Sequence, residues 1–240
     1  MKRLLVVAVI ALAGSAWAEV GKVLVVEEAT RAGADGKAAK LEVGTPIELG
    51  DTLEVKKGNL KLELTDGSVI MLSEKSKLVI KEADFAGQER KGFSAFLEAG
   101  KLWTRVKAAL GGAKYEVTTE RAVAGVRGTI FRIDADALVK GARGGKARNA
   151  SIVRVTEGVV AVKPSDAVAR ASTAQLKPAA KGERKQVPGP TEITADEWEK
   201  KFVELQKGQQ LAVGVDLWEQ AEIEAAAKND AFSKWIEKNQ

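Results

Sequence analysis

The chain has 240 residues, carries a formal net charge of +5, and contains neither histidine nor cysteine. These two absences exclude Ser-His-Asp and Cys-His catalytic sites, disulfide bonds, and zinc or iron–sulfur sites built on these residues. Carboxylates, lysines, hydroxyls and the backbone are left for chemistry, and no pair of carboxylates stands out by its spacing. We therefore predict a protein that is not an enzyme and has no catalytic residues, no cofactor and no metal site.

The first eighteen residues have the pattern of a secretory signal peptide. Lys2 and Arg3 form a short positive region, residues 4–13 are apolar, and residues 16–18 (Ala-Trp-Ala) fit a cleavage site. The apolar stretch is short for a transmembrane helix, so an uncleaved anchor is the less favoured alternative. We expect cleavage after Ala18 and a periplasmic or secreted protein with no stable membrane insertion.

Residues 19–163 have the pattern of an all-β domain. About ten short apolar or alternating runs are separated by turn residues. Leucine alternates with charged residues over 60–64, and Asp-Gly at 66–67 is a strong hairpin signal. A two-residue turn there would place Leu64 opposite Val69, and the apolar run after the turn predicts an interior strand. The series favours a β-roll, sandwich or barrel-like fold.

The C-terminal part has a different pattern. Residues 164–190 hold four of the five prolines, which predicts a linker or an irregular peripheral segment. Over residues 191–240 we predict an α-helical segment, because Thr194 and Glu197 form a capping box and the apolar residues recur at helical spacing. These apolar residues are Trp198, Phe202, Leu205, Leu217, Trp218, Phe232, Trp235 and Ile236. We expect this tryptophan-containing stripe to dock on the core.

The positive charge is concentrated in one segment. Residues 137–187 contain 11 Lys and Arg against 3 Asp and Glu, a net charge of +8, whereas residues 191–240 carry a net charge of −5. The basic segment has no interleaved aromatic residues for base stacking, so we expect no nucleic acid partner. It could contact an anionic polymer or an acidic protein, remain a solvated surface, or pair with the acidic tail. The residues proposed for electrostatic contact are Lys140, Arg143, Lys146 and Arg148.

Two short motifs invite a chemical interpretation. The run around Gly128 has the glycines of a phosphate loop but lacks its lysine, so it predicts a tight turn or a close backbone crossing, where Arg127 could donate hydrogen bonds. Asp134 and Asp136 stand two residues apart after a strand and would point the same way. Without a calcium-loop pattern around them, we interpret these two carboxylates as solvated residues at a strand end.

Several landmarks, in order over residues 40–165, resemble the FecR domain. They are Gly44, Leu49–Asp51, Leu62–Val69, Ser76–Leu78, Leu97–Trp103, Tyr115–Thr119, Val126–Phe131 and Val155–Val160. The resemblance implies an all-β, export-side domain. It implies structural roles, as fold determinants, for Gly50, Asp51, Asp66, Gly67, Ser68, Arg127, Gly128 and Thr129. It carries over no catalytic residue.

In the best-known members of that family, the domain belongs to transmembrane regulators that relay the state of an outer-membrane transporter to a sigma factor. This sequence shows no cytoplasmic anti-sigma segment and no membrane span after the signal peptide, so it resembles a stand-alone exported member. The first hypothesis is a binding protein of the cell envelope that recognises an envelope protein or an anionic, peptidoglycan-type polymer through loops or an exposed edge strand. The second is a periplasmic signal-relay adaptor that acts with a separate membrane regulator or sigma/anti-sigma system.

Overall fold

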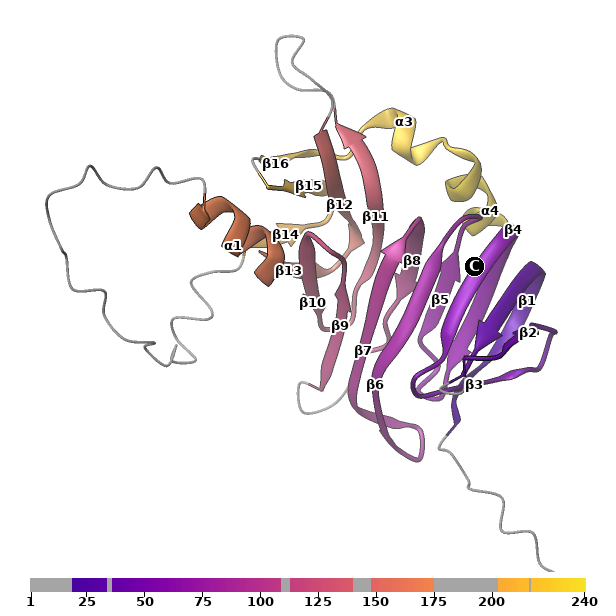
Figure 1. Ribbon diagram of the computed structural model, residues 1–240. Coiled ribbons are helices and arrows are strands. Elements are labelled where there is room, and N and C mark those ends of the chain that lie inside the picture. Colours follow the sequence, from indigo (N-terminus) through magenta and orange to yellow (C-terminus); the bar gives the residue numbers. More distant parts are fainter. Residues whose placement is uncertain (1–18, 34–35, 109–112, 140–147, 175–202, 216) are drawn as a thin grey trace, which may run out of the picture.

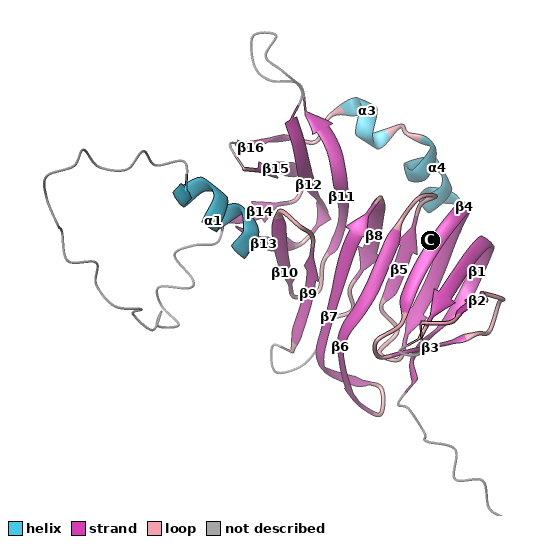
Figure 2. Ribbon diagram, in the orientation of Figure 1, coloured by secondary structure: helices cyan, strands magenta, loops and turns pink. Residues whose placement is uncertain are grey.

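The computed structural model describes residues 19–33, 36–108, 113–139, 148–174, 203–215 and 217–240. Strands dominate and form one strongly curled sheet, with three short helices outside it (Figures 1 and 2). The helices are α1 (Asp166–Ala174), α3 (Ala225–Lys228) and α4 (Ala231–Asn239). None of the helices in the described part is long and apolar enough to cross a membrane. The predicted mainly β fold is confirmed.

The strands follow the chain in the order in which they are numbered. They are β1 (Glu19–Ala32), β2 (Ala38–Lys40), β3 (Pro46–Glu48), β4 (Thr52–Leu64), β5 (Val69–Leu72), β6 (Lys77–Ala86), β7 (Glu89–Ala99), β8 (Lys101–Arg105), β9 (Lys114–Thr118), β10 (Ala122–Val126), β11 (Ile130–Val139), β12 (Arg148–Glu157), β13 (Val159–Pro164), β14 (Val203–Gln206), β15 (Gln209–Gly214) and β16 (Leu217–Glu222).

The spatial order of the strands in the sheet is β14-β13-β10-β9-β7-β6-β4-β5-β8-β11-β12-β15-β16, and β1 pairs with β2, β3 and β4. Neighbouring strands are antiparallel except for β7 and β9, which are parallel. The consecutive strands β14 and β15 pair with β13 and β12, respectively, and not with each other, so this segment links two distant parts of the sheet. The sheet therefore curls around a single large core.

The core lies on the inner face of the curled sheet, because alternate residues of each strand point inward. In β4 the inward positions include Leu60, Leu62 and Leu64, all buried in this core. The expectation of about ten short strands underestimated their number and length: thirteen described strands precede α1, and β4 spans thirteen residues. The polar residues at 56–59 interrupt the apolar pattern without ending that strand.

The hairpin between β4 and β5 differs by one residue from the predicted register. Glu63, not Leu64, lies opposite Val69. The Leu64 amide donates to the Ser68 carbonyl at 2.8 Å, so residues 65–67 form a three-residue loop, with Gly67 at φ 82°. A three-residue loop with a left-handed glycine is a favoured hairpin geometry. The Asp66 side chain stabilises it by accepting hydrogen bonds from the backbone N–H and the hydroxyl of Ser68, both at 2.9 Å.

The register decides which face each side chain of β5 occupies. Ile70 and Leu72 join the inner core, whereas Val69 and Met71 pack on the outer face against α4. All four residues are buried, so the predicted interior strand is confirmed.

The expectation of helix throughout residues 191–240 was wrong for much of the described part. Residues 203–206, 209–214 and 217–222 form β14, β15 and β16, which join the main sheet. Leu205 and Leu217, assigned to a helical stripe, are strand residues, while the helix around Phe232 is confirmed as α4. The capping box at Thr194 lies outside the described residues. Short apolar runs cannot be assigned by periodicity alone, and here pairing with β12 and β13 favours strands.

Candidate functional site: an ion-pair network beneath the C-terminal helix

The outer face of the sheet carries a row of large polar side chains where the C-terminal helices cover it. Strand register places Trp103 of β8, Arg132 of β11, Arg154 of β12 and Gln210 of β15 next to one another in this row. All four residues are buried. Two arginines on directly opposed positions repel each other, so the arrangement requires carboxylates.

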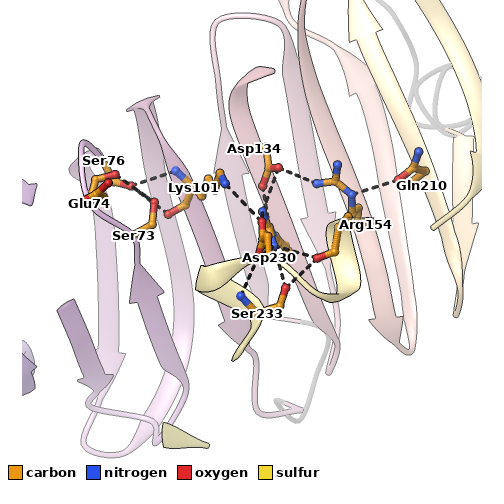
Figure 3. Close-up of polar contacts among 11 residues, drawn as sticks. Ser73, Glu74, Ser76, Lys101, Asp134, Arg154, Gln210, Asp230 and Ser233 are labelled. Atoms are coloured by element: carbon orange, nitrogen blue, oxygen red, sulfur yellow. Dashed lines mark hydrogen bonds and ion pairs between the residues drawn. The ribbon is translucent and has the colours of Figure 1, made fainter. Parts of the chain in front are cut away.

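Asp134 supplies the first carboxylate and lies two residues after Arg132 on the same strand. It accepts hydrogen bonds from Arg132 Nε at 2.7 Å and Nη2 at 3.1 Å, a two-point contact. It also accepts one from Arg154 Nη1 at 2.8 Å, and Arg154 Nε donates to Gln210 Oε1 at 3.0 Å. A single buried carboxylate thus holds both arginines (Figure 3).

Asp230 supplies the second carboxylate from the residue that caps α4. It accepts hydrogen bonds from Arg132 Nη1 at 3.0 Å and Nη2 at 2.5 Å, and from the backbone N–H of Ser233 at 2.8 Å. One carboxylate therefore caps the helix and joins it to β11. Figure 3 shows Asp230 and Ser233 at the start of α4, next to the side chains of Asp134 and Arg154 on the sheet.

The network shifts the ionisation of its members. Burial of Asp230 opposes its ionisation, but hydrogen bonds from Arg132 and the Ser233 amide, and the charge of Lys101, hold its pKa well below the ordinary value. Burial also disfavours the charge on Arg132, yet Asp230 and Asp134 together raise its pKa. Both groups are charged at neutral pH, so the contact between α4 and the sheet is ionic.

Lys101 connects the network to a neighbouring turn. Its Nζ lies 3.3 Å from Asp230 Oδ2, and its backbone N–H donates to Ser76 Oγ at 2.9 Å. Ser76 Oγ is 3.2 Å from Ser73 Oγ, which donates to the carbonyl of Glu74 (Figure 3). The turn thereby fixes the start of β8.

Apolar contacts complete the attachment of α4. Phe232 and Ile236 are buried against Val69, Met71 and Trp103 on the outer face of the sheet. The Arg132 guanidinium lies 5.4 Å from the centre of the Phe232 ring. The predicted docking of aromatic residues from the C-terminal segment on the β domain is therefore observed for α4.

The pH dependence of stability tests the ionic part of this attachment. Because the pKa of Asp230 is lower in the folded than in the unfolded protein, its contribution is present above the ordinary value of 3.8 and is lost as pH falls toward the folded-state value. We expect Asp230→Asn, which keeps a capping side chain, to cost about 1–2 kcal/mol at pH 7. Urea unfolding at pH 7, 5, 4 and 3 should show this difference shrinking below about pH 4. A difference that stays constant down to pH 3 would contradict the assignment.

A second buried ion pair supports the β4–β5 hairpin. Arg90 of β7 pairs with Asp66, and its Nη1 and Nη2 donate to Ser68 Oγ and the Lys107 carbonyl, each at 3.1 Å. Its guanidinium lies 5.1 Å from the centre of the Tyr115 ring. Sequence reasoning missed Arg90, because its partner lies 24 positions away and on a different hairpin.

The other residues of the family resemblance lie at turns. Gly50 has φ 87°, and the next residue, Asp51, is buried and accepts a hydrogen bond from the Glu48 amide at 2.8 Å. Burial raises the pKa of Asp51, against the opposing effects of that amide and of Arg31.

The predicted close crossing at Gly128 is present. Gly128 has φ 63°, and a Cβ atom there would lie 3.0 Å from Ala108 Cβ. Buried Thr129 donates from Oγ1 to the Val159 carbonyl at 3.0 Å. Arg127 is exposed, and within the described part of the chain it reaches neither a carbonyl nor a carboxylate.

The interpretation of Asp134 and Asp136 as two solvated strand-end acids was wrong for Asp134. A bulge between Asp134 and Ala137 interrupts the register, and the two carboxylates contact different partners. Asp134 binds the two arginines of the network, whereas Asp136 accepts from the Gly100 amide at 3.2 Å. Among the described residues, no group of three or more acidic side chains could hold a metal ion.

Most of the residues proposed for electrostatic contact lie outside the described part of the chain. Lys140, Arg143 and Lys146 lie outside the described residues, and Arg148 is the exposed first residue of β12. The role of these four side chains therefore stays a prediction.

Part of the chain matches a known protein family. Residues 51–161 match the model of the family described as FecR protein, a range from β4 into β13 that includes Arg132 and Asp134 but not α4. None of the curated proteins matches the sequence.

Two crystal structures, each of a candidate anti-sigma factor from Parabacteroides distasonis ATCC 8503, resemble the chain with TM-scores of 0.48 and 0.47 at 16% identity. In each case 77% of this chain is covered, and the chain spans 63% and 64% of those proteins.

Proposed function

We propose that the protein is a signal-relay adaptor of the cell envelope that acts with a separate membrane regulator, because residues 51–161 match the FecR protein family. The family match is the observation that carries this proposal, since the best-known FecR domains pass on the state of a transporter. It favours relay over the other hypothesis, simple attachment to an envelope polymer. Relay requires binding to a protein partner, and a large β sheet with loops is suited to that role.

The side chains of the network support a binding role and not a catalytic one. Asp134 and Asp230 each accept several hydrogen bonds from arginine, and the low pKa of Asp230 makes it a poor proton donor at neutral pH. Their contacts hold α4 to the sheet. We therefore propose that the protein is not an enzyme.

The location of the proposed relay rests on the sequence of residues 1–18. Their positive, apolar and small-residue parts are those of a secretory signal peptide, which supports a periplasmic or secreted protein. N-terminal sequencing of the protein from the producing cell tests this directly. A mature chain that begins at Glu19 would support export.

Crosslinking in the native envelope, followed by purification of the tagged protein, distinguishes the two hypotheses. We expect the relay adaptor to capture a membrane protein that carries a sigma-factor-binding segment, and deletion of the adaptor to change transcription dependent on that sigma factor. Sedimentation with purified peptidoglycan or surface polymer, without such a membrane protein, would instead support polymer attachment. A protein that does neither contradicts both hypotheses.

The four basic residues proposed for electrostatic contact provide the variant for the polymer hypothesis. Charge reversal at Lys140, Arg143, Lys146 and Arg148 should weaken sedimentation with an anionic polymer in low salt. The same variant should leave capture of a membrane regulator unchanged if relay uses another surface.

A further inference from the structure

A hollow lies between the outer face of the sheet and the C-terminal helices, beside the ion-pair network. Its volume is about 370 Å³, within the range of small-molecule sites. Strands β8, β11 and β12 form one wall, and α3 and α4 form the other. A molecule bound there would contact both the sheet and the helices.

Three cationic side chains line the hollow without being fully used by partners in the described part of the chain. Arg154 lines it, and although its Nε and Nη1 bind Gln210 and Asp134, its Nη2 has no acceptor among the described residues. Lys207, in the turn between β14 and β15, and Lys228, at the end of α3, also line it. Both lysines are exposed, and neither ammonium group has a hydrogen-bond or ion-pair partner in the described part of the chain.

These three cations are more available to a ligand than the fourth cation that lines the hollow. Arg132 also lines the hollow, but Asp134 and Asp230 occupy its guanidinium. Glu237 of α4 is the acidic side chain among the described lining residues. The lining therefore has an excess of positive charge, which favours an anion.

The remaining lining is apolar. Trp103 from the sheet, Ile223 before α3 and Ile236 from α4 contribute to it. Trp103 and Ile236 belong to the buried cluster that attaches α4. An anion with a hydrocarbon part would bury that part against these side chains and place its charge near Arg154. A small hydrated anion would contact Arg154 without the apolar burial.

We propose that this hollow binds an apolar carboxylate. A carboxylate accepts two hydrogen bonds in one plane, which suits the guanidinium of Arg154 together with a lysine. The same chemistry occurs in a medium-chain fatty acid and in the C-terminal residue of a peptide. The assignment does not depend on the proposed relay function, because it rests only on the lining of the hollow.

Isothermal titration calorimetry of the full protein with octanoate, N-acetyl-phenylalanine and inorganic phosphate tests the site. We expect one or both carboxylates to bind in the micromolar to millimolar range and to raise the melting temperature, because the ligand bridges α4 and the sheet. Binding of octanoate alone indicates an aliphatic acid, and binding of N-acetyl-phenylalanine alone indicates a peptide end. Absence of binding by both, or equal binding of phosphate, overturns the proposal.

A pair of matched double variants locates the binding. Lys207→Gln with Lys228→Gln should weaken carboxylate binding roughly fivefold to tenfold, since each removes one partly exposed ionic contact. Lys234→Gln with Lys238→Gln makes the same change in net charge on exposed positions of α4 that do not line the hollow. We expect the second variant to bind like the unaltered protein. Equal weakening by the two variants would show a general charge effect and overturn the assignment.

Discussion

Replacing Arg132 with methionine is expected to lower the free energy of unfolding by about 3–5 kcal/mol, because the change leaves two carboxylates without their main partner. Asp134 and Asp230 both bind this guanidinium, and Asp134 is buried. Methionine keeps much of the apolar volume against Phe232, so the loss reports the charge and not a cavity. For a chain of this size the melting temperature should fall by about 6–20 °C.

Lys101→Met is the matched control for that variant. It removes another cation that contacts the same Asp230 carboxylate, but 40% of the Lys101 side chain is exposed. An exposed ion pair contributes about 0–1 kcal/mol, so the effect should be small. Thermal unfolding followed by circular dichroism measures both variants. Similar losses for the two would show that burial of the Arg132 pairs does not determine their contribution.

The attachment of α4 can be followed separately from global unfolding. In Arg132→Met we expect faster hydrogen exchange at the amides of α4, because the helix loses its ionic contact while Phe232 and Ile236 still pack on the sheet. Exchange in β9 and β10, which lie elsewhere in the strand order and outside the cluster that attaches α4, should change less. Uniform acceleration throughout the sheet would contradict a local role.

Replacing Arg90 with methionine should lower the free energy of unfolding by a similar amount, because it breaks a different buried ion pair. The Arg90 side chain is fully buried and pairs with Asp66, which is itself 6% exposed. Loss of the guanidinium leaves that carboxylate uncompensated beneath the β4–β5 turn, at a cost of about 3–5 kcal/mol. Equilibrium unfolding in urea at pH 7 measures the loss.

The double variant Arg90→Met with Asp66→Asn separates the ion pair from the packing. Asparagine is neutral and keeps an oxygen that can accept from the Ser68 amide, as Asp66 Oδ1 does. We therefore expect the double variant to be more stable than Arg90→Met alone, by about 1–3 kcal/mol. A double variant less stable than the single one would mean that Asp66 stabilises the turn without Arg90.

The β character of residues 19–163 was predictable from sequence because it depends on local patterns. Strict alternation over residues 60–64 and the apolar run after Gly67 correctly indicate a half-buried strand followed by an interior one. The landmarks that resemble the FecR domain were also recognisable, and the family model confirms them over residues 51–161. These strand patterns can be recognised from sequence because they depend only on residues within one hairpin.

Errors arose where a distant partner decides the structure. The β4–β5 register depends on a three-residue loop in which Asp66 pairs with Arg90, 24 positions away, and the Asp-Gly pair alone does not specify this contact. Residues 203–206 and 209–214 form strands because they pair with β13 and β12, respectively. Their apolar spacing alone is compatible with a helix as well.

The absence of histidine and cysteine by itself excludes every type of catalytic, disulfide or metal site that needs those residues. Only the tertiary structure determines which buried charged side chains pair with one another. Arg132, Arg154 and Asp230 come from strands and a helix up to 98 positions apart, and only the folded sheet places them together. Pairing across such separations leaves no periodic trace in a sequence, because it depends on strand order and register rather than on the spacing of neighbouring residues.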